Sequence, residues 1–350
     1  MYKNIIEIRD QRSEIRDQRS EIRDQRKTYI DFLRIIATFS VIFFHISNQD
    51  ELTTDVNLLK IFHIFETRLY IGVPLFVMIS GVLFLNPERN YNLKKLYGKH
   101  IKRMSIAFLL WSPFYALTSC AFKSTELKDI LTRIVTGHVH LWFLFMIIGL
   151  YMIVPFLREI TKSKFMTKYF LLLALIFASV IPQSISIIAE HSPEISEILR
   201  TVLNKFYFHF VLGYTGYFVL GYALDQVEIS RKFEAVIYFA GLVSIIFFGT
   251  TYGAFSLNSV IICTAIFILC KKHFPTGIKS AGILKFISCH CFGIYLSHSL
   301  FIGILKYFGI TSLRFNLYIS IPTIAILVFI ISFLFSVICK KIPVLKNIIP

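Results

Sequence analysis

The sequence predicts an all-α membrane protein of about ten transmembrane helices, with both termini in the cytoplasm. Hydrophobic residues make up 55% of the 350 residues and charged residues only 17%, a balance that ordinary globular domains do not have. The apolar residues fall in long runs rather than in alternating or amphipathic patterns, as expected for helices in lipid. The positive residues lie between these runs, and their distribution predicts the orientation.

The first 28 residues differ from the rest of the chain. Residues 7–27 repeat a heptad as EIRDQRS, EIRDQRS and EIRDQRK, with a single apolar residue in each copy. A coiled-coil seam needs two apolar positions in each heptad, and a helix would place like charges three and four residues apart. We therefore expect residues 1–28 to form a disordered cytoplasmic arm.

Ten apolar segments follow, and several are near the ~20 residues that span the hydrocarbon core. They lie at residues 29–47, 69–86, 104–122, 139–157, 168–189, 207–225, 234–252, 255–270, 286–308 and 316–339. The loops between them are too short for a second domain. We expect residues 29–339 to form one transmembrane domain and residues 340–350 to form a short cytoplasmic tail.

The net charge of +16 indicates membrane topology rather than a nucleic-acid partner. With the N-terminus inside, the cytoplasmic stretches hold 26 Lys and Arg residues and the outer loops hold 8, as the positive-inside rule requires. No stretch combines basic residues with stacking aromatic residues in a nucleic-acid-binding pattern. An even number of helices then returns the C-terminus to the cytoplasm.

Three ionisable residues lie in the first apolar segment, namely Asp31, Arg34 and His45. Charged groups inside membrane helices are costly and commonly mark a functional site. Arg34 and His45 are eleven residues apart, which places them on one side of a helix and ~16 Å apart along its axis. We expect both side chains to point into one cavity, with Arg34 nearer the cytoplasm.

Two interpretations of this pattern remain open on spacing alone. In the first, Arg34 extends to lipid phosphates, Asp31 neutralises it and His45 caps the outer end of the helix. In the second, Arg34 holds an anion at the cytoplasmic mouth of a passage and His45 transfers a proton deeper inside.

Several motifs occur in a characteristic order along residues 29–339. The most specific is DFLRIIATFSVIFFH at 31–45, which contains the Arg-x10-His spacing. The others are PLFVMISGVLFL at 74–85, HLWFLFMIIGLYMIVPFL at 140–157, GYFVLGYAL at 216–224 and FGIYLSHSLFI at 292–302. In these motifs the chain resembles the acyltransferase family 3 membrane O-acyltransferases of bacterial surface glycans, especially those that acetylate enterobacterial common antigen or the intercellular polysaccharide adhesin.

The resemblance implies a multi-pass protein of the bacterial inner membrane that transfers an acyl group, most often acetyl. It implies acyl-CoA as the cytoplasmic donor substrate, no bound cofactor, and a hydroxyl of an extracytoplasmic or lipid-linked glycan as the acceptor. It also implies that Arg34 and His45 are the functional pair. The family often has Arg-x-x-Arg before the third helix, where this chain reads HIKR, so only Arg103 is carried over as a donor-binding residue.

Other polar and aromatic residues are candidates for an acceptor site or a cavity. They are Ser80, Trp142, Tyr151, Tyr295 and His298. Ser80 lies beside Gly81, a small-residue pair that equally allows close helix packing, and Trp142 equally suits the membrane interface. Tyr295 and His298 are three residues apart and share a helix face. No His or Cys residues have the spacing of a metal site, so we predict none.

A transporter or flippase of glycans or small molecules is the alternative function, because many helices with buried charge also describe secondary carriers. Such carriers commonly consist of related halves with paired broken helices. The sequence has no evident internal symmetry of this kind, and acyl transfer is the favoured prediction.

Overall fold

The computed structural model describes residues 28–48, 53–89, 91–120, 126–251, 253–274 and 281–342. Over these residues the protein is helical and contains no strand, as predicted. Each of the ten predicted apolar segments contains a helix. The predicted arm lies outside the described residues, except for Thr28, which already belongs to the first described helix.

The first half of the described chain contains α2 (Thr28–Ser47), α3 (Val56–Arg68), α4 (Gly72–Phe84), α5 (Leu93–Lys95), η2 (Leu96–Ile101), α6 (Lys102–Cys120), α7 (Leu127–Thr136), η3 (Val139–Leu141), α8 (Trp142–Met152) and α9 (Val154–Thr161). The second half contains α10 (Lys164–Leu173), η4 (Ala174–Val180), α11 (Ile181–His191), α12 (Pro193–Lys205), α13 (Phe208–Gln226), α14 (Arg231–Val243), η5 (Ser244–Phe248), α15 (Leu257–His273), α16 (Ala281–Tyr307), η6 (Ser312–Arg314) and α17 (Leu317–Lys341).

Six stretches of the described residues are long and apolar enough to cross a membrane. They are Thr28–Ser47, Val56–Phe84, Leu127–Met152, Lys164–His191, Gly282–Tyr307 and Leu317–Lys341. The other predicted segments correspond to helices that are shorter or more polar. For example, α15 has 17 residues, and α14 begins with Arg231, Lys232 and a nearby Glu234.

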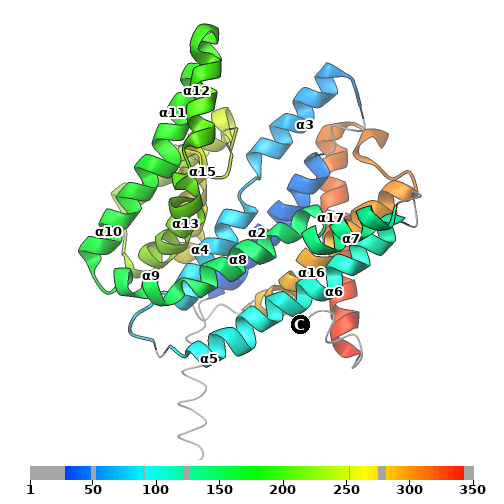
Figure 1. Ribbon diagram of the computed structural model, residues 1–350, viewed down its shortest axis with the longest axis horizontal. Helices are drawn as coiled ribbons and strands as arrows, with labels where there is room; N and C mark the ends of the chain where they lie inside the picture. Colours follow the sequence, from blue (N-terminus) through cyan, green and yellow to red (C-terminus); the bar gives the residue numbers. More distant parts are fainter. Residues whose placement is uncertain are drawn as a thin grey trace, which may run out of the picture.

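Helix α2 occupies the centre of the bundle. It packs against α4, α15, α16 and α17, and α4 in turn packs against α13. Figure 1 shows α10 to α13 and α15 grouped on one side and α3, α6, α7, α16 and α17 on the other, with α2, α4 and α8 between the two groups. The beginning of α2 and the end of α17 lie at the same end of the bundle as α5. Helix α2 can therefore present residues to cavities at both ends.

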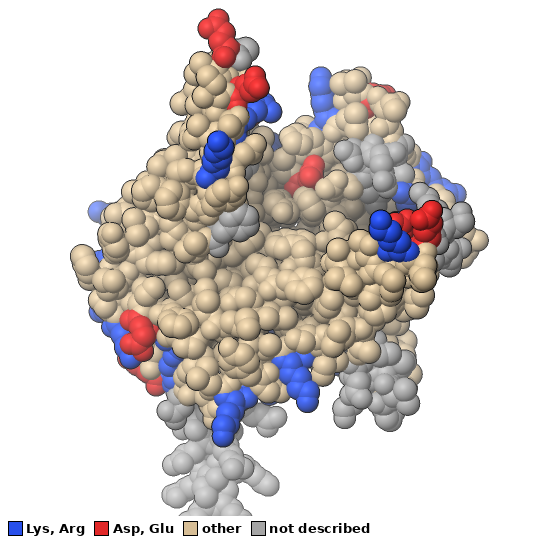
Figure 2. Space-filling view, viewed as in Figure 1, with Lys and Arg blue, Asp and Glu red and all other residues tan. Residues whose placement is uncertain are grey.

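The surface has the polarity of a membrane protein. Figure 2 shows a broad band free of Lys, Arg, Asp and Glu, with charged residues mostly above and below it, and a hollow between the two upper lobes. Many large apolar side chains are exposed, including Phe156, Phe165, Phe233 and Phe239, each at least 70% exposed. Such side chains are stable in contact with lipid, where burial within the protein gives no advantage.

Glycines allow α4 and α13 to approach each other closely. A Cβ atom on Gly81 would lie 1.8 Å from the Phe218 carbonyl oxygen, and one on Gly221 would lie 2.1 Å from the Met78 carbonyl oxygen. Both obstacles are backbone atoms, which cannot turn aside as a side chain can. Gly81 therefore has the packing role that the sequence left open.

We expect Gly81→Val to reduce the stability of the folded protein strongly, because overpacking costs about 1–3 kcal/mol or more and here the clash is with backbone. Thermal unfolding of the detergent-purified variant measures the effect. Gly149→Ala is the control, since a Cβ atom at Gly149 meets nothing within 4 Å. Equal unfolding temperatures for the two variants would contradict the close packing of α4 and α13.

Candidate active site

Arg34 is held in place by two polar partners near the start of α2. Its Nη1 donates to Asp31 Oδ1 at 3.3 Å and to Ser288 Oγ of α16 at 3.5 Å, and Ser288 Oγ donates to the same Asp31 oxygen at 2.7 Å. Asp31 therefore pairs with Arg34, as one interpretation of the sequence expected. The arginine nevertheless faces a cavity between helices.

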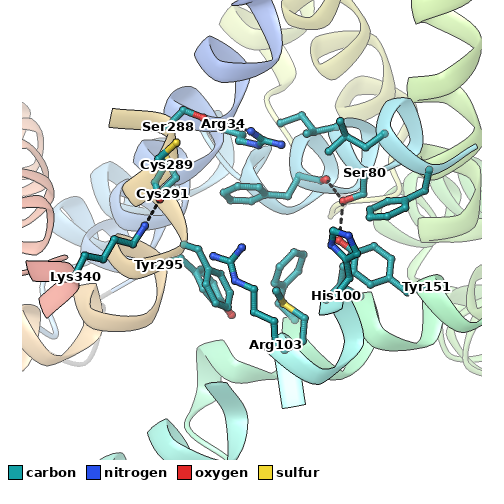
Figure 3. Close-up of a pocket in the computed structure, with 18 residues that line it drawn as sticks. Arg34, Ser80, His100, Arg103, Tyr151, Ser288, Cys289, Cys291, Tyr295 and Lys340 are labelled. Carbon is teal, nitrogen blue, oxygen red and sulfur yellow. Dashed lines mark hydrogen bonds between the residues drawn. The ribbon is translucent and has the colours of Figure 1, made fainter. Parts of the chain in front are cut away.

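This large cavity has a volume of about 510 Å³, within the ~300–1,000 Å³ that is usual for ligand sites. Among the described residues that line it, four basic side chains come from four different elements: Arg34 from α2, His100 from η2, Arg103 from α6 and Lys340 from α17. Figure 3 shows these side chains arranged around one space. Ser80, Tyr151 and Tyr295 also line it, so the structure gathers most of the predicted site residues here.

A turn of π-helix places His100 and Arg103 beside the cavity. Asn92 caps the start of α5, where its Oδ1 accepts from the Lys95 backbone N–H, and the chain continues through η2 directly into α6. Inserted π-helical turns are frequent at functional sites. Partial burial, followed by the charges of Lys99, Arg103 and Lys95, lowers the pKa of His100, so this imidazole is neutral at neutral pH.

Arg103 is positioned by an aromatic ring rather than by a carboxylate. Its guanidinium carbon lies 4.6 Å from the centre of the Phe292 ring, a distance at which the ring attracts the cation. The Arg103 Nε atom is buried without a hydrogen-bond partner in the described part of the protein. This donor is available to an anion in the cavity.

Lys340 and His100 line the large cavity but were not predicted as site residues. Lys340 was placed in the predicted cytoplasmic tail, whereas α17 continues through Lys341. The Lys340 Nζ donates to the Cys289 carbonyl oxygen at 2.5 Å, which holds it against α16. Both residues lie next to an apolar segment on the predicted cytoplasmic side, where basic residues are expected from membrane topology alone. Only the fold brings the two side chains to one cavity.

Ser80 and Tyr151 lie beside each other in the wall of the large cavity. Ser80 Oγ donates to the Phe76 carbonyl oxygen at 3.0 Å and lies 3.5 Å from the Tyr151 hydroxyl. The serine has no base beside it among these contacts, so its position suits a hydrogen-bond donor or acceptor better than a nucleophile.

His45 lies in a second, smaller cavity of about 50 Å³, lined also by Tyr70, His140 and Trp142. This volume is a few times the ~10–15 Å³ that one water requires. Trp142 is 40% exposed, and its ring centre lies 5.9 Å from that of Tyr214. Trp142 at the start of α8 and Tyr151 near its end therefore line different cavities.

The expectation that Arg34 and His45 share one cavity is wrong in this structure. Phe143 and Tyr295 line both the large and the small cavity, and their ring centres are 5.5 Å apart. These two rings therefore form a partition between the spaces that Arg34 and His45 face. Spacing along one helix predicts direction, but it cannot predict side chains that neighbouring helices insert between two residues.

His298 lines neither cavity, but its ring lies beside that of His45. The ring centres are 5.2 Å apart, and His298 is fully buried. Its helix partner Tyr295 donates a hydrogen bond to the carbonyl oxygen of His140. His140 was not predicted as a site residue, although the pattern His138-Val139-His140 before an aromatic helix is a signal for one.

Comparison with protein families identifies the chain. The family model described as an acyltransferase domain matches residues 27–341, which include all of the residues that form the two cavities. Comparisons with curated proteins and with solved structures give no significant match. The match extends from the beginning of α2 to the end of α17, and the chain belongs to acyltransferase family 3.

Proposed function

We propose that this membrane acyltransferase transfers an acetyl group from cytoplasmic acyl-CoA to a hydroxyl of an extracytoplasmic or lipid-linked surface glycan. The large cavity holds the donor, and His45 acts on the acceptor from the small cavity. The membrane is the bacterial inner membrane, with the α5 end of the bundle in the cytoplasm.

The observation that carries this proposal is the convergence of Arg34, His100, Arg103 and Lys340 on one cavity. Three of the four residues are cations and Asp31 pairs with Arg34, while buried positive charge that lacks a counterion is unfavourable. The cluster therefore suits a ligand with several negative charges, to which the neutral His100 can add a hydrogen bond. The phosphates of CoA supply them, and arginine binds phosphate with two parallel hydrogen bonds. All four residues lie near the α5 end, and α5 belongs to the stretch between the second and third apolar segments, which the charge distribution predicts to be cytoplasmic.

The partition between the two cavities supports transfer of a short acyl group. A thioester in the large cavity reaches His45 only past Phe143 and Tyr295. The small cavity, at about 50 Å³, favours acetyl over a long acyl chain. The acceptor hydroxyl attacks the thioester carbonyl carbon, His45 removes the hydroxyl proton, and the C–S bond breaks to release the CoA sulfur.

Family membership favours this reaction over the alternative of a transporter or flippase. The hollow between the lobes in Figure 2 is compatible with either, but a phosphate-binding cluster at one end and a histidine beyond a partition suit two substrates that meet from opposite sides. Net acyl transfer by the purified protein would decide between the two functions.

Donor binding tests the proposal. We expect Arg103→Gln to weaken acetyl-CoA binding about tenfold or more, because hydrogen bonds to charged groups contribute ~1.5–3 kcal/mol. Titration calorimetry on the detergent-purified protein measures the dissociation constant. Lys162→Gln is the matched control, since Lys162 is exposed and pairs with Glu159. Equal affinities for the two variants would contradict the assignment of the large cavity to the donor.

A further inference from the structure

Four histidines from three parts of the described chain form a continuous cluster. His45 comes from α2, His138 and His140 precede α8, and His298 comes from α16. The ring centres are 5.2 Å apart for His45 and His298, 5.0 Å for His298 and His140, and 4.9 Å for His140 and His138. Direct or water-bridged hydrogen bonds span such separations, so the rings form a chain that leads away from His45.

The hydrogen bonds within this cluster leave a proton-accepting atom free on His298. His298 Nδ1 lies 2.6 Å from the Tyr295 carbonyl oxygen, which can only accept, so Nδ1 carries the hydrogen and Nε2 carries a lone pair. The Nε2 atoms of His298 and His140 are buried without a hydrogen-bond partner in the described part of the chain. A packing role alone does not explain two unpaired polar atoms, because each costs free energy.

His138 connects the cluster to the surface. Its Nδ1 lies 2.8 Å from Nδ1 of His140, and unlike His140 it is only half-buried. It follows the positive-φ residue Gly137, at the opposite end of α8 from Tyr151 and the large cavity. The chain of rings therefore opens away from the cavity assigned to the donor.

The groups packed around the histidines carry few charges. Tyr115 of α6 lies against His138 and His140, Tyr295 of α16 lies against His140 and His298, and Tyr70 lines the cavity of His45. Arg133 of α7 is a cation close enough to His138 to interact with it electrostatically. No group of three or more His, Cys, Asp or Glu side chains in the described residues could hold a metal ion, whereas a series of imidazoles suits proton exchange.

We propose that His298 and His140 pass the proton that His45 removes from the acceptor hydroxyl to His138, which releases it to water. This inference rests on the proposed acyl transfer. The hydroxyl oxygen forms a bond to the acyl carbon and its proton moves to His45. The CoA sulfur leaves with the electron pair of the C–S bond and takes a proton from the solution at the donor end. One proton is thus released at the His138 end for each proton taken up at the donor end.

Acyl-transfer kinetics of His298→Ala with and without added imidazole test the relay. We expect kcat to fall about tenfold or more, which is less than the ~10²–10⁴-fold effect of a general base itself, while acetyl-CoA affinity stays unchanged. Free imidazole should restore part of the rate by filling the space that the side chain leaves. His290→Ala is the matched control, because His290 is also a buried histidine of α16 whose Nδ1 contacts a backbone carbonyl oxygen.

His138→Gln gives a second measurement at a half-buried position. We expect it to lower kcat and to change the dependence of kcat on pH, again without loss of acetyl-CoA binding. The relay is overturned if both His298→Ala and His138→Gln transfer acetyl at the rate of His290→Ala. It is equally overturned if imidazole restores nothing in a His298→Ala protein that still binds acetyl-CoA. If the unaltered protein transfers no acetyl group, the proposed function fails and the relay fails with it.

Discussion

Replacement of His45 by Ala is expected to abolish most acyl transfer. Attack by a neutral hydroxyl develops positive charge on its oxygen, so a positioned base contributes about 10²–10⁴-fold in rate. The imidazole lies in the small cavity beside Trp142 and His140, away from the basic residues of the large cavity. The variant should therefore bind acetyl-CoA normally. Initial rates of transfer and donor affinity, measured on the same purified preparation, separate the two effects.

His63→Ala is the control for this experiment. His63 is an exposed histidine of α3, 3.8 Å from Glu66, and lines neither cavity. Its replacement should leave both the rate and the affinity unchanged. Normal transfer by His45→Ala would remove the mechanism proposed for this histidine.

The second large effect is expected for Arg34→Lys, which retains the charge. The Arg34 guanidinium contacts Asp31 and Ser288 while it faces the large cavity. A lysine ammonium is a point charge that cannot bind a phosphate with the two parallel hydrogen bonds of a guanidinium. We expect acetyl-CoA affinity to fall about tenfold, the equivalent of one charge-assisted hydrogen bond.

Arg231→Lys makes the same chemical change at an exposed position of α14 and should leave the affinity unaltered. If Arg34→Lys binds acetyl-CoA normally while His45→Ala does not, the two residues have the opposite roles. Both affinities can be measured by titration calorimetry under the same conditions.

Much of the fold follows from the apolar segments. The first predicted segment, 29–47, corresponds to α2 (Thr28–Ser47), because a predominantly apolar stretch of this length forms a helix in lipid, where its backbone groups must bond to one another. The additional helices α3, α7 and α12 lie mainly in stretches predicted as loops. Their charged residues interrupt the apolar pattern, and they are stable as amphipathic helices that a search for continuous hydrophobicity passes over.

The candidate site was predictable where chemistry and environment conflict within one segment. Arg34 and His45 stand out because ionisable side chains are costly in an apolar membrane helix and therefore indicate a function. Lys340 was not predictable in this way, because positive charge after a membrane segment is ordinary. His140 and His298 are 158 residues apart in the sequence. Only the packing of α16 against the rest of the protein brings their ring centres to a distance of 5.0 Å.

The mass of the surface glycan tests the central claim most directly. Glycan should be compared from cells that have the gene, cells that lack it, and cells complemented with either the unaltered gene or His45→Ala. Acyl transfer to a glycan predicts that loss of the gene lowers the mass by one acetyl group per modified sugar. The unaltered gene should restore that mass, and His45→Ala should not. Identical glycan masses with and without the gene would contradict the account.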